Sequence, residues 1–120
     1  MKTNFKKLQS DNLLKKFGKL LETAAKGWSK VAPKTKSERE SVYDRGGAEC
    51  FLDPNPKDKG ESRYPVCRKT DAQFDCRGAL AAFIRARQHN ENDIAKRAFN
   101  KAKRKKCDWT KNKSLKDYGL

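Results

Sequence analysis

Large apolar residues recur at helical spacing through the first quarter of the chain. Lysines such as Lys6, Lys15 and Lys19 fall largely off the apolar positions, so one face of the segment is apolar and the other is charged. This pattern predicts an amphipathic helix that ends near Gly27 and Pro33. The apolar positions are Phe5, Leu8, Leu13, Leu14, Phe17, Leu20, Leu21 and Trp28.

After a linker over residues 30–36, the chain carries the capping-box pattern Ser-Glu-Arg-Glu over residues 37–40. The Ser37 hydroxyl can accept from the Glu40 amide while the Glu40 carboxylate accepts from the Ser37 amide. A short helix should therefore run to about Arg45 and end at the two glycines that follow. Residues 50–67 place two prolines and a glycine between short apolar clusters, which indicates an irregular loop with extended ends.

Two further helices are predicted toward the C-terminus. Asp75 can cap a helix over residues 77–88, and Asn90 or Asn92 can cap a second helix that ends near Lys106. The short connection implies a helical hairpin. The apolar positions of the first helix are Leu80, Phe83 and Ile84, and those of the second are Ile94, Ala95, Ala98, Phe99 and Ala102. Beyond Trp109 the polar, basic sequence predicts a loose tail.

The composition limits the size of the core. Among 120 residues, 35% are hydrophobic and 38% are charged, which favours one small domain with appendages. The predicted fold class is mainly α, a small helical unit with irregular cysteine-stapled loops over residues 37–110. A basic amphipathic N-terminal arm and linker form residues 1–36, and a basic tail forms residues 111–120.

The charge of +15 lies at the two ends of the chain. Residues 1–36 contain ten bases and two acids, residues 37–75 contain seven and nine, and residues 76–120 contain thirteen and four. Long-range attraction to an anion should therefore come from the ends. The anions to consider are nucleic acid, an anionic membrane face such as an inner membrane, and acidic protein surfaces.

The four cysteines, Cys50, Cys67, Cys76 and Cys107, are separated by sixteen, eight and thirty residues. Zinc fingers bring their ligands as pairs about two to four residues apart, so this spacing disfavours metal, and no cofactor is predicted. Two disulfides fit better, in any of three connectivities, and buried free thiols are the remaining alternative. No apolar N-terminal run resembles a secretion signal, so cytosolic cysteines would ordinarily stay reduced.

A catalytic role finds little support in the sequence. His89, the one histidine, lies in a polar helix connection and is best explained as a solvated turn residue. No phosphate-binding glycine loop, nucleophile elbow or paired-carboxylate signature occurs, so we expect a protein that is not an enzyme and has no small-molecule substrate.

Two sets of residues are candidate contacts with partners. The first could meet phosphate or an acidic surface, although basic residues near a helix end also complement the helix dipole and aid solubility. It comprises Arg85, Arg87, Lys96, Arg97, Lys101, Lys103, Arg104, Lys105 and Lys106. The second could dock the N-terminal arm on a membrane surface or in a partner's groove. It comprises Phe5, Leu13, Phe17, Leu20 and Trp28.

Residues 47–54 (GAECFLDP), 64–67 (YPVC) and 76–87 (CRGALAAFIRAR) resemble a pattern in small basic cysteine-containing proteins of nucleocytoplasmic large DNA viruses. The resemblance implies a virion component assembled in the host cytoplasm, a minor capsid or capsid-cementing protein that bridges neighbouring shell proteins in a large assembly. It also implies a viral thiol oxidase as a route to disulfides without secretion. The alternative is a basic nucleic-acid-binding protein that packages DNA or associates with RNA.

Overall fold

The computed structural model describes residues 25–120 as a small helix-rich globule with two disulfides, as the sequence predicted. The amphipathic helix expected upstream lies, apart from its last residues, outside the described residues. The helices are α2 (Trp28–Val31), α3 (Lys36–Gly46), α4 (Cys76–Gln88) and α5 (Asn92–Arg104), and the strands are β1 (Phe51–Asp53) and β2 (Arg63–Pro65). The 3-10 turns are η1 (Ala48–Cys50), η2 (Lys59–Glu61), η3 (Asp108–Thr110) and η4 (Leu115–Tyr118).

The N-cap of α3 is Thr35, two residues before the predicted cap Ser37. Thr35 Oγ1 accepts from the Glu38 amide at 3.0 Å, and Glu38 Oε1 accepts from the Thr35 amide at 3.1 Å. The prediction of Ser37 as the cap was wrong because the sequence holds two overlapping patterns of this kind, and Glu38 also pairs with Lys69 at 3.3 Å. The helix ends at Gly46 as expected, with Gly47 at φ 85°.

The segment between Cys50 and Cys67 forms a short antiparallel ribbon at the extended ends that the sequence predicted. Phe51 pairs with Pro65, and Asp53 pairs with Arg63. The disulfide between Cys50 and Cys67 closes the base of this ribbon. The ribbon therefore needs a covalent tie and helix α3 beside it, since a two-stranded hairpin alone is marginal in water.

Helices α4 and α5 form the predicted hairpin. Asp75 caps α4 and accepts from the Arg77 amide at 2.8 Å. The expected Asn cap of α5 was wrong, because Asn92 is already the first helical residue and Asn90 makes the turn at φ 58°. The facing surfaces are rich in alanine, which permits a close approach of the two helices. The buried residues of α5 are Ile94, Ala95, Ala98, Phe99 and Ala102, as predicted.

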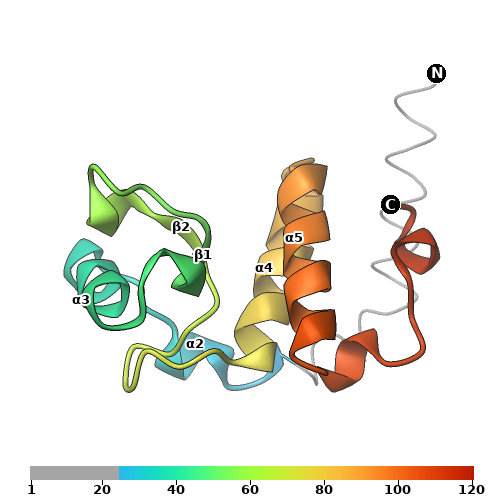
Figure 1. Cartoon of the computed structure of the whole chain (residues 1–120), viewed down its shortest axis with the longest axis horizontal. Coiled ribbons are helices and arrows are strands. Elements are labelled where there is room, and N and C mark those ends of the chain that lie inside the picture. Colours follow the sequence, from blue (N-terminus) through green and yellow to red (C-terminus); the bar gives the residue numbers. More distant parts are fainter. Residues whose placement is uncertain (1–24) are drawn as a thin grey trace.

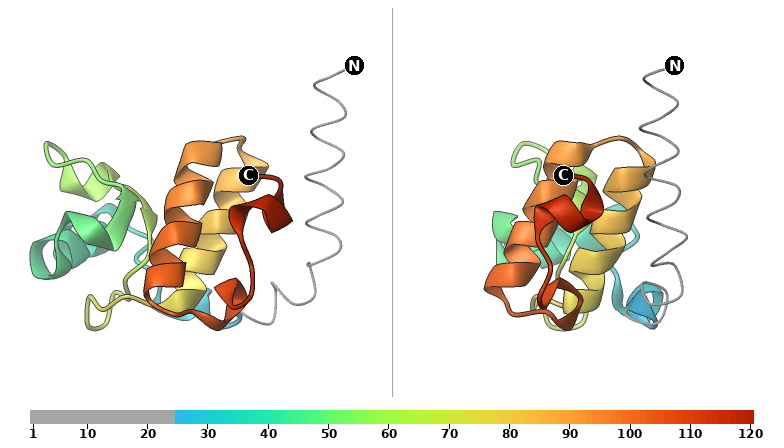
Figure 2. Two further views of the ribbon diagram at one scale, coloured as in Figure 1. Left: turned by 45° about the vertical axis from the view of Figure 1, so that its right-hand side comes forward. Right: turned by 90° about the vertical axis from the view of Figure 1, so that its right-hand side faces the viewer.

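The C-terminal segment packs back onto the hairpin, so the expectation of a loose tail was wrong. Tyr118 is 5% exposed, and its ring lies 5.0 Å from that of Phe83 and 5.8 Å from that of Phe99. Its hydroxyl donates to the Trp109 carbonyl at 3.3 Å. These edge-on aromatic contacts stabilise the C-terminal segment. The segment lies beside α4 and α5 in the ribbon views of Figure 2.

Two regions can be distinguished in the molecule (Figure 1). We call residues 36–75, with α3, β1 and β2, the ribbon lobe, and residues 76–120, with α4, α5 and the C-terminal segment, the hairpin lobe. Buried side chains of both lobes form one continuous core. No helix within residues 25–120 is both long enough and apolar enough to cross a bilayer.

Candidate anion-binding face on α5

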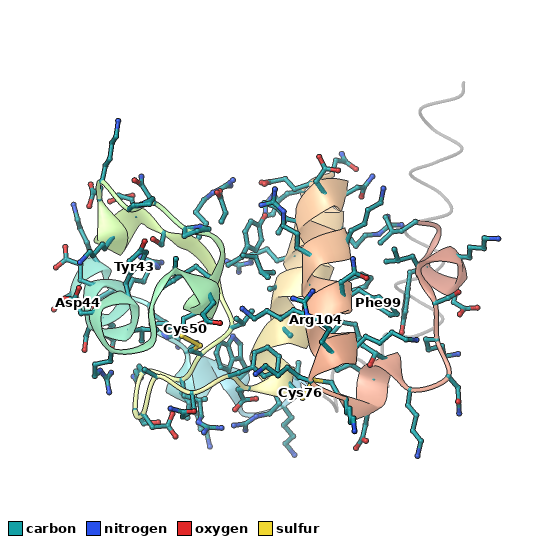
Figure 3. All side chains as sticks on the ribbon, viewed as in Figure 1. Tyr43, Asp44, Cys50, Cys76, Phe99 and Arg104 are labelled. Carbon is teal, nitrogen blue, oxygen red and sulfur yellow. A yellow bond between two sulfur atoms is a disulfide. The ribbon has the colours of Figure 1, made fainter. Side chains whose placement is uncertain are left out.

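One face of α5 is buried, and the opposite face is basic and exposed. Lys96, Arg97, Lys103 and Arg104 recur around Asn100 at positions opposite the buried stripe, and all five are exposed. From the first to the last of them the helix rises about 12 Å. Figure 3 shows Arg104 and Phe99 on different sides of α5, with Phe99 toward the C-terminal segment. We call these five residues the α5 face.

The charges of the α5 face are not compensated by acids. Across residues 25–120, no base on α5 takes part in a salt bridge, and the helix itself contains a single acid, Asp93, in its first turn. The ribbon lobe differs sharply. There Lys59 meets Asp44 at 2.7 Å, and Arg68 meets Asp71 at 2.7 Å.

Two bases of the α5 face and two bases beside it are occupied by internal contacts. Arg97 donates to the Leu52 carbonyl at 3.2 Å, and Lys101 donates to the Glu49 carbonyl, so both tie α5 to the ribbon lobe. Burial lowers the pKa of Lys101 from its ordinary value. Lys103 contacts the Lys113 carbonyl and lies over the Phe99 ring. Lys105 lies over the Phe74 ring at 5.8 Å.

The nine basic residues proposed from sequence therefore do not form one surface. Arg87 is only 9% exposed and donates to Asn92 Oδ1 at 3.1 Å, so it belongs to the hairpin packing, and burial lowers its pKa. Arg85 lies on α4, beside a groove described below. Lys96, Arg104 and Lys106 are exposed, and no hydrogen bond or salt bridge engages their side chains within residues 25–120. These three are the bases most accessible to a partner.

The second disulfide holds the face in place. It joins Cys76 at the start of α4 to Cys107 just after the end of α5, with a Cα–Cα distance of 5.6 Å. With Cys50–Cys67, this selects one of the three connectivities that the sequence left open. All four sulfur atoms are thus committed to disulfides, and no metal-binding cluster of His, Cys, Asp or Glu occurs within residues 25–120.

The docking residues proposed for the N-terminal arm are mostly beyond the part of the chain described. Phe5, Leu13, Phe17 and Leu20 lie outside residues 25–120. Trp28 is 8% exposed, and its ring covers Gly78 of α4 so closely that a Cβ there would lie 2.6 Å from the ring. The structure therefore places Trp28 largely in the internal packing against α4, with a small exposed part.

His89 is exposed at the end of α4, in the solvated turn that the sequence predicted. Arg39 was missed as a candidate contact. It lies in α3, whose charges are nearly balanced, and only the fold brings it beside the groove that Arg85 also lines. No local sequence signal marks Arg39.

The fold and the α5 face together define a disulfide-stabilised, helix-rich protein with a basic surface that forms no salt bridges within residues 25–120. No protein-family model, curated protein or solved structure matches this chain.

Proposed function

We propose that this protein is a non-enzymatic structural protein of a large viral particle, with a minor capsid or capsid-cementing role. In this proposal the α5 face contacts an acidic surface of a neighbouring shell protein. The observation that carries the proposal is that no α5 base forms a salt bridge within residues 25–120, whereas the ribbon lobe pairs most of its acids.

Electrostatics gives the physical reason. Several exposed like charges on two turns of helix repel one another in the free protein, and an acidic partner removes that repulsion on binding. Rim charges of this kind raise the association rate and select the partner more than they add affinity. A basic, rigid helix face is therefore suited to orienting one protein on another in an ordered assembly.

The two disulfides support a structural role rather than a catalytic one. Each closes a loop, of 17 and 31 residues: Cys50–Cys67 ties the two ends of the ribbon together, and Cys76–Cys107 ties the start of α4 to the segment just after α5. The viral part of the proposal is supported by the resemblance over residues 47–54, 64–67 and 76–87, which contains three of the four bonded cysteines.

The alternative function, binding of DNA or RNA, is favoured by the same face. Lys96 and Lys103 lie seven residues apart, as do Arg97 and Arg104, so the bases line up along two helical turns and could follow a phosphate backbone. Affinity for nucleic acid would then fall steeply with salt, because each neutralised phosphate releases counterions.

Zero-length carbodiimide cross-linking in the native assembly tests the proposal. This reagent joins lysine amines to carboxylates in contact, so Lys96, Lys103 and Lys106 should link to Asp or Glu of other protein chains. Lys57, exposed in the ribbon lobe, is the control and should give few such links. Ultraviolet cross-links from α5 to nucleic acid, without protein links, would reject the shell-protein role in favour of the alternative.

A further inference from the structure

A groove separate from the α5 face runs between α2, β2 and α4. Its volume is about 810 Å³, within the range of about 300–1,000 Å³ typical of ligand-binding clefts. A smaller hollow of about 370 Å³ continues it, and both are lined by Arg39, Tyr64, Pro65 and Arg85. Together the two hollows have room for a chain segment rather than a single small group.

The floor of the groove is apolar. Ala81 and Ile84 of α4 line it and are only half-buried, and Pro65 of β2 and Trp28 of α2 form its other sides. Ile84 packs only partly against the core, so an apolar side chain of a partner can complete its burial. The small Ala81 leaves the room that such a side chain needs.

The rim of the groove is cationic. Lys34, Arg39 and Arg85 line the larger part, and no acid among residues 25–120 does so. Within residues 25–120, neither Lys34 nor Arg85 takes part in a salt bridge. The smaller hollow is lined by two acids, and both have basic partners: Arg63 lies 3.0 Å from Glu91, and Lys36 lies 3.8 Å from Glu61. The electrostatic complement of this groove is an acidic segment.

Tyr64 fixes the junction between the two hollows. Its backbone has φ 58°, a left-handed conformation that is costly for a bulky residue. Its hydroxyl donates to Glu91 Oε1 at 3.1 Å, which holds the ring in position. Because this wall is already ordered, a ligand does not have to order it on binding.

We propose that this groove binds an acidic peptide segment of a partner protein, with an apolar side chain on Ala81 and Ile84 and acidic side chains against Arg85 and Arg39. The chain's own residues 1–24 are poor occupants, because they carry six lysines against two acids. This surface goes beyond the proposed function, since it lies on α4 and is independent of the α5 face. The two surfaces together would let one molecule contact two neighbours.

Selection from a displayed library of random 16-residue peptides on the full-length oxidised protein tests this inference. Enriched peptides should carry Asp or Glu around one or two aliphatic or aromatic residues. Ala81→Phe, which fills the floor, and Arg85→Glu, which reverses the rim charge, should each weaken the selected peptide about tenfold or more. Lys96→Glu, the same charge reversal on the α5 face, should leave its affinity within about twofold.

Three results would overturn the inference. They are a library that yields no enrichment or only basic peptides, equal weakening by Lys96→Glu and Arg85→Glu, and displacement of the selected peptide by a synthetic peptide of residues 1–24. Arg85→Lys separates charge from folding, because it should retain most of the affinity that Arg85→Glu removes. Lys96→Glu should not affect the groove. A negative result in this experiment would therefore reject the groove as a peptide site without bearing on the proposed role of the α5 face.

Discussion

The ribbon lobe and the hairpin lobe use charge in different ways. Residues 36–75 contain eight bases and nine acids, and seven of those acids lie in salt bridges. Residues 76–120 contain thirteen bases and four acids, and no base of α5 forms a salt bridge within residues 25–120. This difference shows that charge density alone does not identify a candidate binding site. Charged residues that the fold leaves without oppositely charged partners are the better indicator.

The lobes also differ in what holds them together. The ribbon lobe relies on ion pairs, side-chain hydrogen bonds to the backbone and the Cys50–Cys67 disulfide. The hairpin lobe relies on alanine-rich helix packing and on an aromatic cluster of Phe83, Phe99, Trp109 and Tyr118. The hairpin lobe can therefore leave its outer charges unpaired, because its stability comes from apolar packing.

The largest effect should come from removing the hairpin disulfide. Replacing Cys76 and Cys107 together by Ala should lower the free energy of unfolding by about 4 kcal/mol, because a 31-residue loop is released. Replacing Cys50 and Cys67 should cost about 3 kcal/mol, for a loop of 17 residues. Urea denaturation of both double variants measures the difference. A smaller loss for the hairpin pair would contradict this ranking.

Next in size is the effect of Tyr118→Ala. The change removes a buried ring from the aromatic cluster and should lower the free energy of unfolding by about 3 kcal/mol. Tyr118→Phe keeps the ring and loses the hydrogen bond to the Trp109 carbonyl, so it should lower the free energy of unfolding by about 1 kcal/mol. Thermal unfolding compares the two. If Tyr118→Ala were neutral, the C-terminal segment would be loose after all.

Asp75 interacts with residues of both lobes. Replacing it by Asn should lower the free energy of unfolding by about 2 kcal/mol. Burial alone would raise the pKa of Asp75, but hydrogen bonds from Arg77 and from Arg68 outweigh it and hold the pKa below the ordinary value of 3.8. A lowered folded pKa means that this stabilisation is present above about pH 4 and is lost as the pH falls further.

The measurement is the free energy of unfolding between pH 6 and pH 2, for the native protein and for Asp75→Asn. The variant should be less stable at pH 6 and should show a shallower acid limb. Part of that limb should persist, because Glu38 and Asp71 also have pKa values lowered to about 2. Identical acid limbs for both proteins would show that Asp75 is not held as a paired carboxylate.

The smallest effects should come from single surface lysines. Lys59→Ala removes a salt bridge to Asp44 and should cost less than about 1 kcal/mol, because both partners are exposed. Lys96→Ala has no pair to break and should change stability by less than about 0.5 kcal/mol in either direction. Chemical denaturation of both variants sharpens the comparison between lobes. A clear destabilisation by Lys96→Ala would mean that Lys96 has a structural partner.

Helical periodicity predicted α4 and α5 and every buried residue of α5, because local spacing alone determines which face an amphipathic helix buries. The cap of α3 depended on a choice between Thr35 and Ser37 that a distant contact of Glu38 with Lys69 helps to decide. A single tyrosine in a polar segment has no periodicity, so the burial of Tyr118 could not be predicted.

The candidate site was predictable as a run of basic residues but not as a surface. Arg87 and Lys96 look alike in the sequence, yet one lies in the hairpin packing and the other in solvent. The groove was not predictable at all, because Arg39 and Arg85 are far apart in the sequence and meet only through the tertiary fold. The sequence could not predict which cysteines pair, because the pairing also depends on the tertiary fold.

The most direct test of the central claim is a fluorescence titration of the full-length protein with poly-L-glutamate, a model acidic protein surface, over a series of salt concentrations. The double variant Lys96→Glu with Arg104→Glu is compared with Lys30→Glu and Lys57→Glu, which make the same change in net charge at exposed positions outside α5. We predict that the α5 variant loses about tenfold more affinity at low salt than the control variant. Equal losses in the two double variants would contradict the account, because binding would then follow net charge rather than the α5 face.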